Sequence, residues 1–233
     1  MKFFVGTSGY SYKEWKGIFY PPKLPPSEML PFYSQRFSTV EINNTAYRMP
    51  KESVLKSWLK QVPADFRFVI KAPQTITHFK RLKNAESLMK DFLEATSALK
   101  KQCGPLLFQL PGNFKKDLPR LKEFLKLLGS KTPAVFEFRH ASWFDEDVYR
   151  CLRAKSCALC VVDAQEFPRA DLVDTAKWGY FRLRREKYTT RQLADWIKKI
   201  KAQRWNEVYV YFKHEDAATG PALARRFLEL AMR

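Results

Sequence analysis

The feature of this sequence best suited to chemistry is a repeated placement of polar residues at the ends of β-branched or aromatic runs. In AVFEFRH, at residues 134–140, side chains two positions apart share a strand face, so Glu137 and Arg139 lie together. Other runs repeat this alternation. It predicts that nine polar side chains project into one region: Glu41, Asn43, Lys71, Gln109, Glu137, Arg139, Asp163, Arg182 and Arg184.

Carboxylates beside cations can act as an acid and a base, because neighbouring charges move their pKa values apart. We therefore predict three catalytic residues, with Glu137 and Asp163 transferring protons and Glu41 orienting the substrate. The predicted substrate-binding residues are Ser8, Asn43, Lys71, His78, Gln109, Arg139, His140 and Arg182. The alternative is a structural salt-bridge network, because charges at an apolar barrel mouth are costly to desolvate unless they are paired.

Lys71 admits a second interpretation. A lysine with a depressed pKa can act as a Schiff-base nucleophile. Neighbouring carboxylates are expected to raise its pKa, so we favour Lys71 as an electrostatic clamp that holds an anion together with Arg139 and Arg182.

No cofactor is predicted, because the sequence contains neither a Gly-rich dinucleotide fingerprint nor a phosphate-binding loop. A carboxylate-only Mg²⁺ or Mn²⁺ site through Glu41, Glu137 and Asp163 is the metal alternative. The spacing of Cys151, Cys157 and Cys160 lacks a compact fourth ligand, which favours buried thiols over a metal site.

The elements that must position these residues alternate between strands and helices. Eight strand-like segments lie near 3–7, 38–43, 66–71, 106–110, 134–139, 158–163, 178–184 and 208–213. The helix between the fourth and fifth has Asp117 at its cap and Gly129 at its end. This order predicts an α/β fold, a single (β/α)₈ barrel of the TIM type formed by residues 1–233, with the polar cluster at the C-terminal ends of the strands.

Two stretches depart from the alternation of strands and helices. The aromatic loop at 10–26 either stacks on a sugar or a base, or anchors itself by packing against the barrel. The stretch at 164–177 holds little helical signal.

The charge of the 233-residue chain is strongly positive. With 42 Lys and Arg residues against 24 Asp and Glu residues, the formal net charge is +18, which favours an anionic small molecule or a nucleic acid as partner. Solvated lysine-rich helix faces are the alternative. The candidate nucleic-acid patch follows the fourth and seventh strands and comprises Lys115, Lys116, Arg120, Arg184, Arg185 and Lys187. No apolar run spans a bilayer and the start lacks a signal peptide, so we expect a cytoplasmic protein.

Several segments together resemble the YecE-like family, a group of barrel proteins of unknown function. The matching stretches are GTSGYSY at 6–12, VEINNTAY at 40–47, FRFVIKAP at 66–73, GPLLFQLP at 104–111 and EFRH at 137–140. The chain departs from that family at two places, with Arg184-Arg185 where the pattern shows His-Gly, and Lys213-His214 where asparagines usually follow the last strand. The resemblance implies a barrel fold and supplies no activity.

We accordingly predict an enzyme that uses acid-base or electrostatic catalysis on a phosphorylated, sugar-like or nucleic-acid substrate. The predicted reaction class is hydrolysis or isomerisation. The competing hypothesis is a non-catalytic protein that binds a nucleic acid or another anion at the same barrel mouth.

Overall fold

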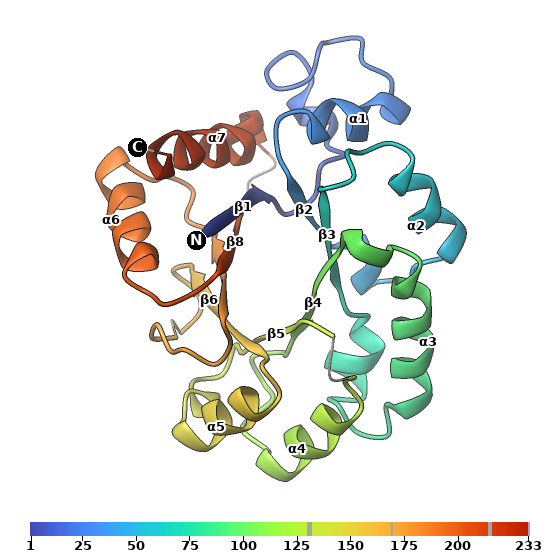
Figure 1. The fold of residues 1–233 in the computed structure, drawn as a ribbon, viewed down its shortest axis with the longest axis vertical. Coiled ribbons are helices and arrows are strands. Elements are labelled where there is room, and N and C mark those ends of the chain that lie inside the picture. The colour runs from blue at the N-terminus through green and yellow to red at the C-terminus, as the bar shows by residue number, and fades with distance from the viewer. Residues whose placement is uncertain (130–131, 169, 214–215, 233) are drawn as a thin grey trace.

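A ring of eight parallel strands with helices on its outside forms this protein (Figure 1). The computed structural model describes residues 1–129, 132–168, 170–213 and 216–232. The strands are β1 (Lys2–Thr7), β2 (Thr39–Ile42), β3 (Arg67–Lys71), β4 (Cys103–Gln109), β5 (Ala134–Glu137), β6 (Ala158–Asp163), β7 (Trp178–Leu183) and β8 (Glu207–Phe212). Consecutive strands pair from β2 through to β8, and β8 also pairs with β1. The predicted (β/α)₈ barrel is confirmed.

The helices follow the strands as the periodicity predicts. They are α1 (Met29–Ser34), α2 (Glu52–Leu59), α3 (Glu86–Ser97), α4 (Leu118–Lys126), α5 (Glu146–Ala154), α6 (Thr190–Lys201) and α7 (Thr219–Ala231). Asp117 caps α4 by accepting the backbone N–H of Arg120 at 3.0 Å, which confirms the predicted start of that helix. Between β6 and β7 the described residues form no helix. In the described part of the chain, no helix is both long and apolar enough to span a bilayer.

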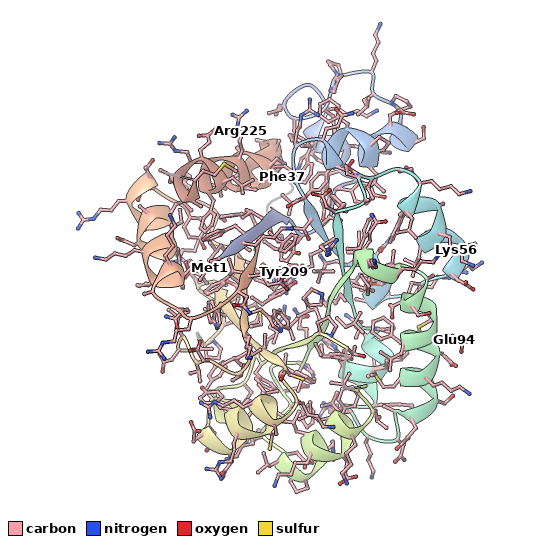
Figure 2. The ribbon with its side chains drawn as sticks, viewed as in Figure 1. Met1, Phe37, Lys56, Glu94, Tyr209 and Arg225 are labelled. Atoms are coloured by element: carbon pink, nitrogen blue, oxygen red, sulfur yellow. The ribbon has the colours of Figure 1, made fainter. Side chains whose placement is uncertain are left out.

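Strand alternation divides the core into two layers. Side chains facing outward from the strands pack under the helices, and those facing inward fill the barrel. Tyr209 lies inside the ring of strands, whereas Lys56 and Glu94 lie on the outer helices (Figure 2). The buried residues of the barrel interior are Phe4, Val69, Leu107, Val135, Ala158, Cys160, Val162, Tyr180, Tyr209 and Tyr211.

The ring closes between β1 and β2 through a side chain as well as backbone. Ser8 and Glu41 form a single parallel bridge just beyond β1, and the Gly9 N–H donates to the Glu41 carbonyl at 2.8 Å. Further down the seam, the buried hydroxyl of Tyr33 accepts the Thr7 N–H at 2.9 Å and donates to the Thr39 carbonyl at 3.0 Å. Tyr33, from α1, thus supplies the hydrogen bonds that a continuous ladder would otherwise provide.

A glycine permits this close approach. A Cβ on Gly6 would lie 2.2 Å from the Thr39 carbonyl oxygen, so a larger residue at this position would push β1 away from β2.

Replacing Tyr33 by Phe should destabilise the fold by about 1–3 kcal/mol, because the Thr7 N–H loses its partner while it stays buried. The measurement is the free energy of unfolding from urea denaturation. Tyr47→Phe is the matched control, because Tyr47 is 81% exposed, and it should change stability by less than about 0.5 kcal/mol. Equal effects of the two substitutions would contradict the assignment of Tyr33 to the seam.

Candidate functional site

Polar side chains from six strands meet at the C-terminal end of the barrel. Side chains two residues apart share a strand face, and this alternation places Asn43, Gln109 and Arg139 on the inner face. Below this level the barrel is apolar and aromatic. The polar layer therefore caps the interior at the end where barrel enzymes hold their active sites.

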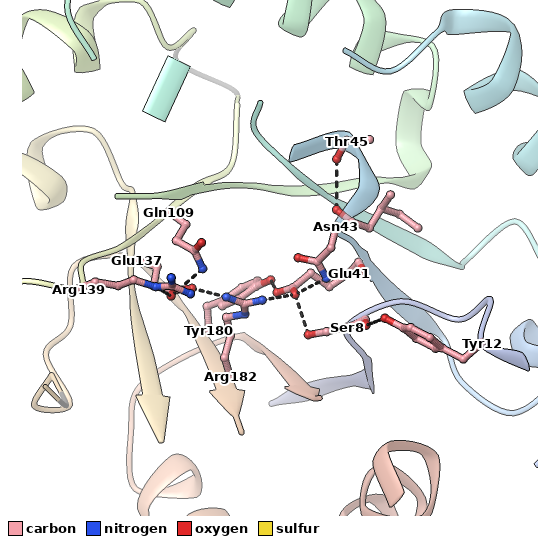
Figure 3. Close-up of polar contacts among 11 residues, drawn as sticks. Ser8, Tyr12, Glu41, Asn43, Thr45, Gln109, Glu137, Arg139, Tyr180 and Arg182 are labelled. Atoms are coloured by element: carbon pink, nitrogen blue, oxygen red, sulfur yellow. Dashed lines mark hydrogen bonds and ion pairs between the residues drawn. The ribbon is translucent and has the colours of Figure 1, made fainter. Parts of the chain in front are cut away.

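Arg182, on β7, lies at the centre of this layer (Figure 3). One guanidinium nitrogen donates to Glu137 on β5, and the other terminal nitrogen donates to Glu41 on β2 at 2.7 Å. Both glutamates are fully buried, and Arg182 is 2% exposed. A single guanidinium thus holds two buried carboxylates on opposite arcs of the barrel.

Both carboxylates also accept hydrogen bonds from other side chains. Glu41 accepts hydrogen bonds from Ser8 at 2.7 Å, from Asn43 at 3.0 Å and from the Tyr180 hydroxyl at 2.6 Å. Glu137 accepts from Gln109 at 2.8 Å and from Arg139 Nε at 3.0 Å. Each carboxylate oxygen is therefore committed to at least one donor of the protein.

These contacts decide the ionisation of the pair. Burial alone would raise the pKa of Glu41 and of Glu137, but the Arg182 charge and the hydrogen bonds outweigh it and hold both pKa values below their usual range. Burial likewise opposes the charge on Arg182, and the two glutamates raise its pKa well above the ordinary value. All three groups are charged at neutral pH.

Replacing Arg182 by Met should reverse the pH dependence of stability. In the wild type, the lowered glutamate pKa values give stability that is present above about pH 4.3 and lost as the pH falls below it. Without Arg182, burial raises those pKa values, so the variant should lose stability as the pH rises from about 4 toward 7. At pH 7 we expect a loss of about 3–5 kcal/mol by urea denaturation.

The control is Arg226→Met, which breaks an exposed ion pair to Glu229 and should cost less than about 1 kcal/mol at any pH. Adding Glu41→Gln and Glu137→Gln to Arg182→Met should restore much of the stability at pH 7. A variant with the pH slope of the wild type would show that Arg182 does not set the ionisation of the pair.

Above the carboxylates is an open cavity of about 460 Å³. Its walls include most of the predicted substrate-binding residues. Those lining it are Ser8, Tyr12, Asn43, Asn44, Tyr47, Lys71, Gln74, His78, Gln109, Arg139, Arg182, Arg184 and Lys213. Among these described residues, five are basic, and the carboxylates beneath them are Glu41 and Glu137. The walls of the cavity are therefore mainly cationic.

Lys71 and His78, which line the cavity, both have lowered pKa values. Burial, reinforced by the Arg182 charge, lowers the pKa of Lys71 to about 8 against the opposing effect of Glu137 and Glu41. Burial and the charge of Lys71 lower the pKa of His78 to about 4, so its imidazole is neutral at pH 7. Glu137 and Glu41 do raise the pKa of Lys71, as expected, but burial and the Arg182 charge outweigh them, so the expected net increase is wrong.

The inward orientation predicted for Asp163 is also wrong. Its carboxylate accepts from Trp196 Nε1 of α6 at 3.1 Å, from the Tyr188 hydroxyl at 3.0 Å and from Arg185 at 2.8 Å. On β6 the inward positions carry Cys160 and Val162, so Asp163 faces the helix layer. Asp163 is therefore not available for proton transfer in the cavity, and the three-carboxylate Mg²⁺ or Mn²⁺ site is not assembled.

His140 does not line the cavity either. His140 is offset by an odd number of residues from Glu137 and Arg139, so it points away from their face. Its Nδ1 instead accepts the Ser142 N–H at 3.1 Å and caps the short turn at Ala141–Trp143. The cysteines are free thiols in the structure, with Cys157 and Cys160 buried. His214 lies outside the described residues.

The aromatic loop divides between the two roles considered for it. Trp15 and Tyr20 are each 1% exposed and pack in the outer core, which is anchoring. Tyr12 lines the cavity, and its hydroxyl donates to the Ser8 carbonyl at 2.7 Å. Thus the loop forms one wall of the cavity and is fixed by its buried rings.

The candidate nucleic-acid patch is partly committed to ion pairs. Lys116 contacts Asp145 at 3.0 Å and Arg120 contacts Asp117 at 3.0 Å, both at the surface. Arg185 pairs with Asp163. Three residues of the patch remain: Arg184, which lines the cavity, and Lys115 and Lys187, which are exposed.

Several residues that complete the site were not among the predicted site residues. Tyr180 precedes Arg182 by two residues on β7, and that spacing is the signal that places both inside the barrel. Lys213 follows β8 by one residue, and Tyr47 and Gln74 lie in loops whose course the sequence does not specify. His78 reaches the cavity from a π-helical turn at Thr75–Phe79, a feature frequent at functional sites.

Residues 4–233 match the family described as "Protein of unknown function DUF72". This chain belongs to that family. It is 33% identical to the UPF0759 protein YecE of Escherichia coli K12 over 60% of this chain and 50% of YecE, so the chain spans about half the length of that relative. It is 24% identical to the UPF0759 protein YunF of Bacillus subtilis over 91% of this chain and 79% of YunF.

Solved structures agree with the barrel. The DUF72 protein TM1631 of Thermotoga maritima superposes with a TM-score of 0.83 at 27% identity, over the whole of both chains. PbGH5A, a glycoside hydrolase family 5 enzyme of Prevotella bryantii, superposes with a TM-score of 0.56 at 12% identity, over 97% of this chain and 95% of that chain. The second likeness concerns the fold alone.

Proposed function

We propose that this DUF72 protein is an enzyme that holds a phosphorylated, sugar-like substrate in the cavity at the C-terminal barrel mouth. The observation that carries the proposal is the convergence of Lys71, Arg139 and Arg184 on one cavity of about 460 Å³, beside the buried Arg182. A phosphoryl group meets a surplus of fixed donors there, and fixed charges of this kind also stabilise negative charge that develops in a transition state.

Arg184 is the basic cavity residue best placed to contact a ligand. Its side chain makes no hydrogen bond or ion pair with the residues that the structure describes, whereas Arg139 and Arg182 hold Glu137. Burial and the nearby Arg182 charge lower the pKa of Arg184, so its unpaired charge is partly desolvated. An anionic group of the substrate would relieve both costs.

The rim suits a ligand with a flat or ring-shaped body. Tyr47 lines the cavity and is 81% exposed, with its ring available for stacking on a sugar or a base. Tyr12 forms part of the same wall.

The roles of the two buried glutamates follow from their contacts. Glu41 and Glu137 have no oxygen without a protein donor, so they act here as positioning residues that fix Arg182, Ser8 and Gln109. Direct proton transfer by Glu137 stays a prediction, tested by the turnover of Glu137→Gln.

Replacing Arg184 by Met should weaken the binding of inorganic phosphate and of glucose 6-phosphate about tenfold, because one charge-assisted hydrogen bond is lost. Isothermal titration calorimetry at low salt measures both dissociation constants. Arg225→Met, at a side chain 79% exposed outside the cavity, should leave both unchanged. If neither ligand binds the wild type at millimolar concentration, or if both variants bind equally, the anion site is not in this cavity.

The enzyme and a non-catalytic binder differ in turnover. A screen of sugar phosphates and phosphate esters should yield at least one substrate that the wild type converts, with Arg184→Met losing most of that activity. Binding without turnover across the screen would favour the binder.

Binding of nucleic acid at the same end of the barrel is a second candidate. It is favoured by the net charge of +18 and by Lys115 and Lys187, which follow β4 and β7, are exposed, and make no ion pair within the described part of the chain. Phosphate contacts release counterions, so such binding is largely independent of sequence and falls steeply with salt.

A salt titration with single-stranded and duplex DNA and RNA measures this directly. We expect the double variant Lys115→Ala/Lys187→Ala to reduce the slope of log K against log salt by about two units, because two phosphate contacts are removed. The control is Lys56→Ala/Lys126→Ala, which removes the same charge from α2 and α4. Absence of binding at about 50 mM salt would exclude nucleic acid as the partner.

A further inference from the structure

We propose that Lys71 is a nucleophile, and that its amine forms an imine with the carbonyl carbon of a phosphorylated aldehyde or ketone bound in the cavity. This inference rests on the proposed function and narrows its substrate class. The observation behind it is the position of Lys71, which ends β3 inside a cationic cavity without a carboxylate to hold it as an ammonium ion.

The geometry frees the amine. Among the described residues, no hydrogen bond or salt bridge reaches Lys71 Nζ, and the Thr45 hydroxyl donates to the Lys71 backbone carbonyl at 2.8 Å. The two carboxylates of the inner layer, Glu41 on β2 and Glu137 on β5, give all their oxygens to other donors. The carboxylates around Lys71 are therefore already paired with other donors.

Burial and the surrounding positive charges favour the neutral amine of Lys71, against the opposing effect of Glu41 and Glu137. The positive groups come from β7, the segments just after β5 and β7, and the segment after β8: Arg139, Arg182, Arg184 and Lys213. The negative groups are Glu41 and Glu137, and His78 is neutral. Burial and the Arg182 charge together bring the pKa of Lys71 to about 8, so an appreciable fraction of the amine is unprotonated at neutral pH. Desolvation beside a second cation is an established means of activating lysine.

The same surroundings select the substrate. Attack by an amine requires an electrophilic carbon, and the remaining cations of the cavity require an anionic group on the same molecule. A small phosphorylated carbonyl compound carries both. Its phosphate would contact Arg184 while its carbonyl carbon lies beside Lys71, since both side chains line the one cavity.

The step balances without an added oxidant or metal. The nitrogen lone pair of Lys71 attacks the carbonyl carbon, and a proton passes from nitrogen to the oxygen to give a carbinolamine. The C–O bond then breaks, the hydroxyl leaves as water together with the remaining proton of the nitrogen, and a C=N bond is left. Hydrolysis of the imine restores the free amine.

Reductive trapping tests the inference on the intact wild-type protein. Glyceraldehyde 3-phosphate with sodium cyanoborohydride converts an imine into a stable secondary amine, and peptide mass spectrometry locates it. At pH 7.5 we expect Lys71 to be labelled at least about tenfold faster than exposed Lys56, because a lysine of ordinary pKa, about 10.4, is almost fully protonated. The Lys71 rate should reach its half-maximum near pH 8.

Unphosphorylated glyceraldehyde is the matched probe, and it should label Lys71 more slowly because it lacks the group that Arg184 binds. Added inorganic phosphate should slow labelling by glyceraldehyde 3-phosphate. Lys71→Arg keeps the charge, so it should retain phosphate binding and lose every trapped product at position 71.

Three results would overturn the inference: labelling of Lys71 no faster than that of Lys56, a half-maximum near pH 10, or no preference for the phosphorylated probe. If phosphate still binds and Arg184→Met still weakens it, the anion site stands and only the nucleophile is wrong. If phosphate does not bind at all, the proposed function fails with it.

Discussion

The site depends on the burial of one guanidinium between two carboxylates. Arg182 reaches Glu41 and Glu137 from β7, and the three side chains are within 2% of complete burial. Two buried carboxylates without this cation would be protonated or would expel their strands toward water, because the cost of an uncompensated buried charge exceeds most single packing contributions. The contact therefore fixes the relative positions of β2, β5 and β7 at the barrel mouth.

The same contact determines the chemistry above it. Because Arg182, Arg139 and neutral donors occupy the carboxylates, the outer cations Lys71 and Arg184 form no ion pair among the described residues. Their unpaired charges make the cavity cationic, and the Arg182 charge also lowers the pKa of Lys71. A structural salt bridge and a functional site are thus parts of one arrangement, in which the inner layer supplies rigidity and the outer layer remains available to a ligand.

The closure of the ring links this site to the N-terminal loop. Ser8 lies at the seam between β1 and β2, where it forms the backbone bridge to Glu41 and donates its hydroxyl to the Glu41 carboxylate. Tyr12 then donates to the carbonyl of Ser8 from the wall of the cavity. The seam and the cavity share residues, so a change that opens β1 from β2 would also move one side of the site.

The alternation of side chains along the strands was sufficient to predict the barrel and most of the inner polar layer. The observed strands begin and end within two residues of the predicted ones, except that β4 begins three residues earlier. Glu41, Gln109 and Glu137 face inward as predicted because strand periodicity is a local property of the backbone. The inward orientation was predicted wrongly for Asp163, an ionisable residue that ends its strand on the outer face. The Trp196 N–H in the buried stripe of α6 was the signal that a hydrogen-bond acceptor was needed there.

The tertiary structure decided three further features. These are the ionisation of Lys71, the course of the loops that carry Tyr47 and His78, and the hydrogen bonds of Tyr33 across the seam. Each depends on groups far apart in the chain: Lys71 responds to Arg182, and Tyr33 joins Thr7 to Thr39. A sequence shows which charges exist but not which are already paired, and a pKa is set by the charges that remain unpaired and by the water that is excluded. The sequence by itself determined the fold and the residue types at the barrel mouth, whereas only the folded arrangement determined which of them are free to act.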